Sequence, residues 1–222
     1  MPIAPAPTAL IIGASRGLGL GLVRELAGRG YSVTGTVRSE ADRAAVTEAG
    51  GRAAIADVTD AASIAALASP LDLLFINAGV SGPAHDDAAQ ATAADLGALF
   101  QTNVTGPVAA ARALLPQLAP GGVIAFMSSR MGSVADNTRG DKELYRASKA
   151  ALNSLIRSMA AKLDPAPTIL TLHPGWVRTD MGGPAAPLDV ATSVHGLIDV
   201  IEARRGLPGV AFLDYTGAEL PW

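Results

Sequence analysis

The chain has 222 residues, and its 17 basic and 20 acidic side chains give a formal net charge of −3. Apolar residues make up 49% of the composition, which argues against intrinsic disorder and, at this length, indicates one domain over residues 1–222. Cysteine is absent, which excludes disulfides, thiolate metal sites and a cysteine nucleophile. The three histidines lack the spacing of metal ligands, so we expect no metal site.

The charge distribution also narrows the range of partners. Lys and Arg do not cluster as they do in nucleic-acid-binding proteins, so we expect no nucleic-acid partner. No run approaches the roughly 18 consecutive apolar residues needed to span a membrane. The first residues lack the basic segment of a secretory signal. We therefore expect a cytoplasmic protein with no membrane partner.

Short apolar runs alternate with longer amphipathic segments along the whole chain. Runs that are apolar on both faces are typical of parallel strands buried between two helix layers. The alternation predicts an α/β fold, a doubly wound Rossmann-type parallel sheet of about seven strands with helices on both faces. The predicted strands are 8–12, 31–37, 52–56, 71–76, 122–127, 168–173 and 210–214. The predicted helices are 18–27, 40–49, 60–68, 92–118 (bent near Gly106-Pro107), 143–163 and 189–204.

A glycine-rich turn follows the first predicted strand. Gly13, Gly17 and Gly19 have the spacing G-x3-G-x-G, where dinucleotide-binding folds place a pyrophosphate on a helix N-terminus. Gly13 allows the tight turn, Gly17 lets the backbone approach the pyrophosphate, and Gly19 lets the helix pack closely on the strand. An ordinary glycine-rich helix start is the alternative, and the position directly after the first strand favours the nucleotide site. The same candidate site includes Ser15, Arg16 and Leu18.

The end of the second predicted strand indicates which dinucleotide is preferred. Folds that bind NAD place an acidic residue there to hold the ribose 2′-hydroxyl, and this chain has none in the segment 36–39. Arg38 and Arg16 could instead converge on a 2′-phosphate, which a guanidinium binds in a bidentate manner. We therefore predict NADP(H) in preference to NAD(H), with a solvated loop position for Arg38 as the alternative.

Tyr145 and Lys149 are four positions apart on a predicted helix and share one of its faces. A free tyrosine has a pKa of about 10, and a neighbouring ammonium favours its phenolate, so the pair can donate or accept a proton. An exposed surface pair is the alternative. Polar segments also end three predicted strands at 77–79, 128–132 and 173–179, and the carboxyl ends of parallel strands share one rim of the sheet.

Together these motifs resemble the short-chain dehydrogenase/reductase family over essentially the whole chain. The stretches 128–134 and 172–183 are also similar to a compact subgroup that includes C-factor-like proteins and sniffer-type carbonyl reductases. The resemblance implies an NADP(H)-dependent oxidoreductase that transfers hydride between nicotinamide and a carbonyl or alcohol substrate. It is carried by the glycine turn and by Asn77-Ala78-Gly79, Asn103, Ser129, Tyr145 with Lys149, and Pro174-Gly175.

The resemblance also implies roles for single residues. Tyr145 is expected to be the general acid in carbonyl reduction and the base in alcohol oxidation, and Lys149 to lower its pKa and bind the nicotinamide ribose. Ser129, which the pattern Ser-x-x-Gly favours over Ser128, is expected to hydrogen-bond the substrate oxygen. Asn103 is expected to hold a water of the proton relay, with a helix-bending asparagine as the alternative. Further expected cofactor contacts are Asp57 (at the adenine, or else a helix cap), Val58, Asn77, Ala78, Gly79, Pro174, Gly175, Val177 and Thr179.

The chain departs from the family pattern in three places. Ile12 stands where the family usually has Thr, so an apolar contact is expected there. The interval from Ser129 to Tyr145 is 16 positions, longer than in the commonest members, and its extra residues fall in the polar loop 136–141, which could cover the pocket or disturb a subunit contact. Residues 176–188 form a short substrate loop, and because its segment 179–188 is rich in Gly and Pro, we expect that segment to be mobile and the pocket to be open.

Two other functions stay open. One is an NADP-binding redox-sensing or signalling protein with little turnover, and the other is a structural partner protein with a vestigial pocket. The retained Ser129, Tyr145 and Lys149 favour the enzyme. The family often assembles through its two long helices, and a homodimer or homotetramer is compatible with the Ala-rich predicted helices. The candidate pocket residues predict a hydrophobic or aromatic carbonyl substrate; they are Val80, His85, Arg130, Trp176 and Met181.

Overall fold

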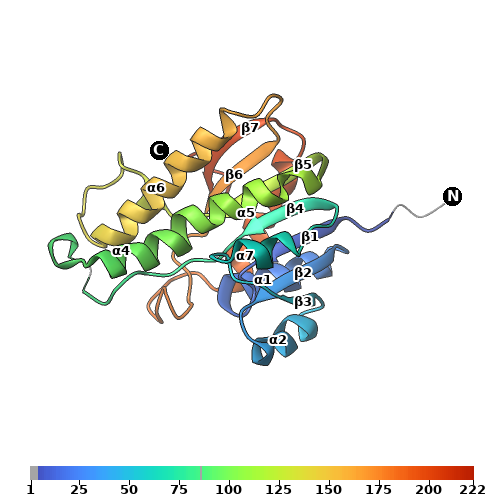
Figure 1. The fold of residues 1–222 in the computed structure, drawn as a ribbon, viewed down its shortest axis with the longest axis horizontal. Coiled ribbons are helices and arrows are strands. Elements are labelled where there is room, and N and C mark those ends of the chain that lie inside the picture. The colour runs from blue at the N-terminus through green and yellow to red at the C-terminus, as the bar shows by residue number, and fades with distance from the viewer. Residues whose placement is uncertain (1–4, 86) are drawn as a thin grey trace.

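The structure, a computed structural model, describes residues 5–85 and 87–222. In this part of the chain seven strands form one parallel sheet in the order β3-β2-β1-β4-β5-β6-β7, with helices on both faces (Figure 1). The predicted doubly wound α/β fold is therefore confirmed. The strands are β1 (Thr8–Ile12), β2 (Ser32–Val37), β3 (Arg52–Ile55), β4 (Leu71–Ile76), β5 (Leu118–Met127), β6 (Thr168–His173) and β7 (Gly209–Asp214).

Two hydrophobic cores lie on the two faces of the sheet. Side chains of successive strand residues point to opposite faces, so Leu73 and Phe75 enter one core while Leu74 and Ile76 enter the other. This is why the central strands are apolar at most positions. The first core is covered by α1 (Gly17–Gly28), α2 (Arg43–Glu48) and α7 (Val190–Arg204), and the second by α3 (Ala61–Ala65), α5 (Gly106–Leu114) and α6 (Glu143–Ala160).

The stretch predicted as one helix over 92–118 is instead three pieces. It consists of α4 (Ala93–Phe100), a π-helical turn (Gln101–Thr105) and α5, and β5 already begins at Leu118. The widened turn ends two residues before Pro107, whose ring in a regular α-helix would clash with the carbonyl four residues earlier. Helices predicted at 40–49 and 60–68 are also shorter, since the first opens with a 3-10 turn and the second ends at Ala65. No helix in the described ranges is both long and apolar enough to cross a membrane.

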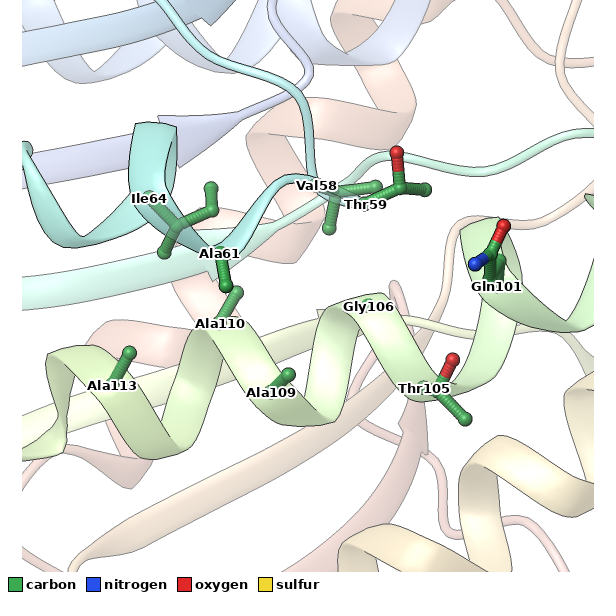
Figure 2. Close-up of a pocket in the computed structure, with 10 residues that line it drawn as sticks. All are labelled: Val58, Thr59, Ala61, Ile64, Gln101, Thr105, Gly106, Ala109, Ala110 and Ala113. Carbon is green, nitrogen blue, oxygen red and sulfur yellow. The ribbon is translucent and has the colours of Figure 1, made fainter.

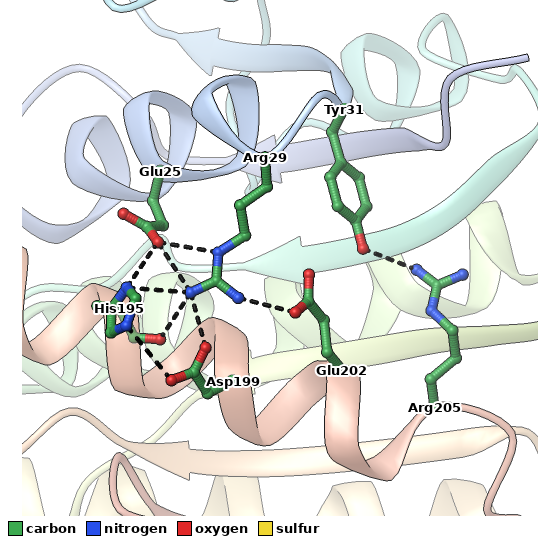
Figure 3. Close-up of polar contacts among 7 residues, drawn as sticks. All are labelled: Glu25, Arg29, Tyr31, His195, Asp199, Glu202 and Arg205. Atoms are coloured by element: carbon green, nitrogen blue, oxygen red, sulfur yellow. Dashed lines mark hydrogen bonds and ion pairs between the residues drawn. The ribbon is translucent and has the colours of Figure 1, made fainter.

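An ion-pair cluster joins α1 to α7 (Figure 3). The Arg29 guanidinium lies 2.8 Å from Glu25, 2.7 Å from Asp199 and 2.8 Å from Glu202. His195 Nδ1 lies 2.9 Å from the Glu25 carboxylate on the opposite helix. The Arg29 side chain is only 19% exposed, so this cluster is better shielded from water than an isolated surface pair.

Candidate active site

The turn after β1 is held by its two neighbouring strands. The Gly13 carbonyl oxygen accepts a hydrogen bond from Asn77 Nδ2 at 2.7 Å, and the Gly13 N–H donates to Thr36 Oγ1 at 3.0 Å. Gly13 has a φ of 89°, and a Cβ atom there would lie 2.9 Å from the Ala78 backbone. A Cβ atom on Gly19 would lie 2.0 Å from the Gly13 carbonyl oxygen. Both positions therefore require glycine.

Ile12 lies in the second core, as its apolar side chain suggested. Its carbonyl oxygen accepts hydrogen bonds from the backbone N–H groups of Asn77 and Ala78, both at 2.9 Å. On the β2 side, the turn is held by the hydroxyl of Thr36, which accepts the hydrogen bond from the Gly13 N–H. The sequence had not singled out Thr36. Its only sequence signal is its place at the end of the second apolar run, in register beside the turn.

The N-terminus of α1 opens toward the space in front of this turn. Arg16 is the N-cap residue, its backbone is extended, and its side chain makes no capping hydrogen bond. The first backbone N–H groups of this twelve-residue helix are therefore suited to hold a phosphate or pyrophosphate. Ser15, Gly17 and Leu18 are half-buried along the same edge.

The two arginines expected to meet at a 2′-phosphate have different partners. Arg16 Nη1 lies 2.6 Å from Asp180 Oδ2 in the substrate loop, an ion pair that the sequence did not indicate. Arg38 is exposed just after β2. Its charge contributes to a lowered pKa of Asp57, whose largest cause is a hydrogen bond from the Thr59 backbone N–H. The two guanidinium groups thus flank the turn without sharing a partner in this structure.

Asp57 does not act as the cap of the following helix. Its Oδ1 accepts hydrogen bonds from the backbone N–H and the hydroxyl of Thr59, both at 2.8 Å. The cap of α3 is Asp60, whose carboxylate accepts from the Ala62 N–H. The alternative of a helix cap was therefore wrong for Asp57, and the adenine contact stays a prediction. Val58 beside it is buried in the second core.

Ser129 lies at the start of a short turn that packs tightly on α6. Its hydroxyl accepts a hydrogen bond from the Met131 N–H at 3.1 Å and lies close enough to Tyr145 to act on its pKa. A Cβ atom on Gly132 would lie 2.9 Å from the Lys149 backbone, so only glycine lets this turn reach the helix. The pattern Ser-x-x-Gly thus has a steric cause: the glycine brings the serine hydroxyl to the tyrosine.

Ser128 points the other way. Its hydroxyl donates a hydrogen bond to Asn153 Oδ1 at 2.7 Å inside the protein, and its side chain is buried. This hydrogen bond ties the end of β5 to the middle of α6. The choice of Ser129 over Ser128 as the residue facing the substrate is consistent with this geometry.

The ionisation of the Tyr145–Lys149 pair differs from expectation. Lys149 Nζ donates a hydrogen bond to the Met127 carbonyl at 2.9 Å and lies 5.8 Å from the centre of the tyrosine ring. Burial lowers the pKa of Lys149 to about 8. Burial raises the pKa of Tyr145 to about 12, although the nearby Ser129 hydroxyl acts in the opposite direction. In the protein alone the pKa of Tyr145 is thus raised rather than lowered as expected, because burial disfavours its phenolate.

Asn103 projects from the π-helical turn into the interior. Its Nδ2 donates to the Val80 carbonyl at 2.8 Å and to Ser148 Oγ at 3.1 Å, while its Oδ1 accepts from the Val80 N–H at 2.8 Å. These three bonds leave one Oδ1 lone pair free among the described residues. A Cβ atom on Gly79 would lie 3.4 Å from Asn103 Oδ1 and 3.5 Å from Lys149 Nζ. The two polar atoms therefore face the same small space, which is suited to a water molecule.

The substrate loop (residues 176–188) is tied to itself by hydrogen bonds. Trp176 Nε1 donates to the Gly182 carbonyl at 2.8 Å, and the backbones of Arg178 and Leu188 pair at 2.8 Å. These bonds argue against the wide mobility expected from its Gly and Pro content. The expected cofactor contacts at the start of this region follow β6 directly and are Pro174, Gly175, Val177 and Thr179.

Two cavities flank the site. One of about 170 Å³ lies between α3 and α5, where small alanine side chains of α5 leave room beside Val58 and Thr59 (Figure 2). The other, of about 310 Å³, lies between the loop 136–141 and α6. Its helical lining residues, Glu143, Arg146, Ala147 and Ala150, lie on the face of α6 away from Tyr145 and Lys149. This loop therefore lies beside the outer face of the helix.

The histidines offer no metal centre among the described residues. No group of three or more His, Cys, Asp or Glu side chains is close enough there to hold a metal ion. His173 ends β6, and burial lowers its pKa to about 4, so it is neutral at pH 7. Its Nδ1 has no hydrogen-bond partner among these residues.

A parallel sheet with a glycine turn and a Ser–Tyr–Lys set at its carboxyl edge defines a dinucleotide-binding protein of the oxidoreductase type. The model of the short chain dehydrogenase family matches residues 7–187, and the chain belongs to this family.

Several individual proteins share this architecture. The chain is 44% identical over 156 residues to C-signal of Myxococcus xanthus, covering 69% of this chain and 93% of that protein. A short-chain dehydrogenase/reductase from Burkholderia multivorans with bound NADP has a TM-score of 0.93 and 40% identity over 98% of this chain and 100% of that one. The carbonyl reductase Sniffer of D. melanogaster has a TM-score of 0.82 and 30% identity over 98% and 100%. The predicted similarity to C-factor-like and sniffer-type proteins is thus confirmed.

Proposed function

We propose that this protein is an NADP(H)-dependent carbonyl reductase with Tyr145 as its general acid. The observation that carries the proposal is the placement of the Ser129 hydroxyl beside Tyr145, with Lys149 Nζ 5.8 Å from the ring centre, at the same edge of the sheet as the glycine turn. Two hydroxyl donors meet there at a place that a carbonyl oxygen could share. Such donors stabilise the negative charge that grows on oxygen as the carbonyl is reduced.

The residues of the turn fit a dinucleotide. The closely packed glycines leave a backbone cradle, and the uncapped start of α1 offers N–H donors to a pyrophosphate. Arg16 and Arg38 flank the cradle as candidate partners of a 2′-phosphate, and the similar Burkholderia multivorans protein binds NADP. Asn77, Gly79 and Thr179 complete the proposed holding set. When bound, the nicotinamide supplies or accepts the hydride.

The ionisation of Tyr145 favours reduction over oxidation. With a pKa raised to about 12 by burial, its phenol is protonated at pH 7 and ready to donate a proton to the substrate oxygen. Its replacement proton comes through Lys149 and a water held in the space that Lys149 Nζ shares with Asn103 Oδ1. Lys149 suits this step because burial brings its pKa to about 8, close to physiological pH.

The rim of the site favours an apolar substrate. Four of the seven large hydrophobic side chains that are exposed in the described residues lie in the segments that follow the carboxyl ends of β4, β5 and β6; they are Val80, Val134, Trp176 and Met181. The substrate loop alone contributes Trp176, which is 55% exposed, and Met181, which is 54% exposed. We propose that the substrate is a hydrophobic or aromatic carbonyl compound. Binding such a compound would remove the exposed apolar side chains at the pocket mouth from water, which is energetically favourable.

Substitution of Tyr145 by phenylalanine tests the proposal. Tyr145→Phe should lower kcat for reduction of aromatic aldehydes and ketones by about 10²–10⁴-fold and leave NADPH bound. The matched control is Tyr31→Phe, which removes a hydroxyl that hydrogen-bonds Arg205 away from the site and should keep turnover. Near-wild-type turnover of Tyr145→Phe would refute the assignment.

A signalling or redox-sensing role is the second candidate, because C-signal is among the similar proteins. Assays of the purified protein with NADPH and a panel of aldehydes, ketones and quinones separate the two functions. Tight NADPH binding without turnover of any member of the panel would favour the sensor.

A further inference from the structure

The glycine turn and the substrate loop touch each other at two consecutive positions. Arg16 Nη1 lies 2.6 Å from Asp180 Oδ2, between residues that are 164 positions apart in the chain. One residue further along the turn, a Cβ atom on Gly17 would lie 3.5 Å from the Thr179 methyl group. The loop therefore rests against the turn at the entrance of the proposed dinucleotide site.

Asp180 is presented to Arg16 by a loop whose shape is fixed internally. The hydroxyl of Thr179 accepts a hydrogen bond from the Gly182 N–H at 3.1 Å, and the Thr179 carbonyl accepts one from the Gly183 N–H at 2.8 Å. These bonds enclose Asp180 in a tight turn, so its carboxylate is held toward Arg16. The pair itself is exposed, with 77% and 75% of the two side chains in contact with water, so a competing anion can reach it.

We propose that Asp180 is a positioning residue that competes with the 2′-phosphate of NADP(H) for Arg16. This inference rests on the proposed function. A phosphate dianion is a stronger partner for a guanidinium than one carboxylate oxygen, so NADP(H) draws Arg16 away from Asp180. NAD(H) has no 2′-phosphate and leaves the pair intact. The exchange of partner removes one of the two contacts between the turn and the loop, and thereby links cofactor binding to the loop that carries Trp176 and Met181.

The dissociation constants of NADPH and NADH test the competition. In Asp180→Asn, NADPH should bind about 2- to 5-fold more tightly, the range expected for an exposed ion pair that no longer has to be broken, and NADH should bind unchanged. Arg16→Met should weaken NADPH binding at least about 10-fold, and adding Asp180→Asn to it should change nothing further. Adenosine 2′,5′-bisphosphate, which has the 2′-phosphate but no nicotinamide, should follow NADPH.

A matched control separates competition from a general charge effect. Asp136→Asn removes a carboxylate from a neighbouring loop, where its nearest cation is Arg130 at 3.9 Å, and should leave the affinities for both dinucleotides unchanged. Equal tightening of NADPH and NADH by Asp180→Asn, or additive effects of the Arg16 and Asp180 substitutions, would overturn the inference. Failure of the wild-type protein to bind NADPH would instead contradict the proposed function.

Fluorescence of Trp176 reports on the loop without any turnover. The sequence has two tryptophans, so the background Trp222→Phe leaves Trp176 as the only reporter. In this background, NADPH should shift the Trp176 emission of the protein that retains Asp180. Asp180→Asn should shift the emission of the dinucleotide-free protein in the same direction. An emission that responds to NADPH but not to Asp180→Asn would show that the pair does not position the loop.

Discussion

Gly19 of α1 offers a substitution whose effect should be opposite to its usual one. Replacing a glycine inside a helix by alanine ordinarily stabilises a protein by about 1 kcal/mol. At Gly19 the added Cβ would lie 2.0 Å from the Gly13 carbonyl oxygen and 2.6 Å from Asn77 Nδ2. These are the two atoms that hydrogen-bond each other at 2.7 Å, so Gly19→Ala must separate them.

The expected loss follows from these contacts. Breaking the hydrogen bond between Asn77 and Gly13 costs about 0.5–1.5 kcal/mol, and forcing a methyl group into a packed site costs about 1–3 kcal/mol. Against a helix gain of about 1 kcal/mol, the net destabilisation is about 2 kcal/mol. For a chain of this size that corresponds to a Tm lower by roughly 4–8 °C.

Gly97→Ala is the matched control for this prediction. Gly97 is exposed inside α4, and a Cβ atom there would meet nothing within 4 Å, so the same substitution should stabilise by up to about 1 kcal/mol. Calorimetry and urea unfolding of both variants, with NADPH titration, measure the two effects. If Gly19→Ala is as stable as the wild type, or if both variants shift in the same direction, the close packing of turn and helix is refuted.

Three other substitutions test interior contacts, with urea unfolding as the measurement. Ser128→Ala should lower the free energy of unfolding by about 1–3 kcal/mol, since buried Asn153 Oδ1 loses its donor. Arg29→Met should cost about 1 kcal/mol at pH 7. That cost should fall as the pH drops below the ordinary glutamate pKa of 4.5. Burial alone would raise the pKa of Glu25, but hydrogen bonds from His195 and Arg29 lower it overall, and the contribution of Glu25 is lost when it is protonated. Lys149→Met should abolish a rise in stability between about pH 8 and 10, where buried Lys149 is deprotonated before an unfolded lysine.

Each of these has an outcome that contradicts it. An unchanged free energy of unfolding for Ser128→Ala would show that the hydrogen bond to Asn153 contributes nothing. A cost of Arg29→Met that is independent of pH would show that Glu25 is not stabilised by the cluster. The third comparison is made without dinucleotide. If the free energy of unfolding has the same pH dependence above about pH 8 in the wild type and in Lys149→Met, Lys149 is charged inside the protein.

The strands could be predicted more closely than the helices, for a physical reason. Strands 8–12, 71–76 and 168–173 match the structure because they are buried on both faces, so each apolar run ends where the strand ends. The predicted helix 92–118 hid the π-helical turn, since hydrophobic spacing does not distinguish one widened turn from a bend. It also ran into β5, which starts in a segment with Pro and two Gly that indicated a loop.

The candidate site divides in the same way. Ser129 could be chosen over Ser128 because Ser-x-x-Gly132 matches the family pattern, and the structure shows a steric cause for this spacing at Gly132. The pairing of Arg16 with Asp180 joins segments 164 positions apart, and no local pattern indicates it. The direction of the Tyr145 pKa shift was missed because it depends on burial by surrounding elements, which a spacing of four residues on one helix does not show.

The cluster of Arg29 with α7 has a consequence for the order in which the protein can be completed during synthesis. The core that α1 shares with the sheet also contains Val194, Leu197 and Ile201 of α7, which is synthesised long after α1. Until then the flank of α1 and the adjoining strands stay uncovered, and Arg29 lacks its two acidic partners on α7, Asp199 and Glu202. Contacts this distant in sequence form slowly and leave apolar surface open to aggregation. A nascent chain stopped before residue 190 should therefore be a chaperone client, whereas one released with α7 complete can close its first and last helices against each other.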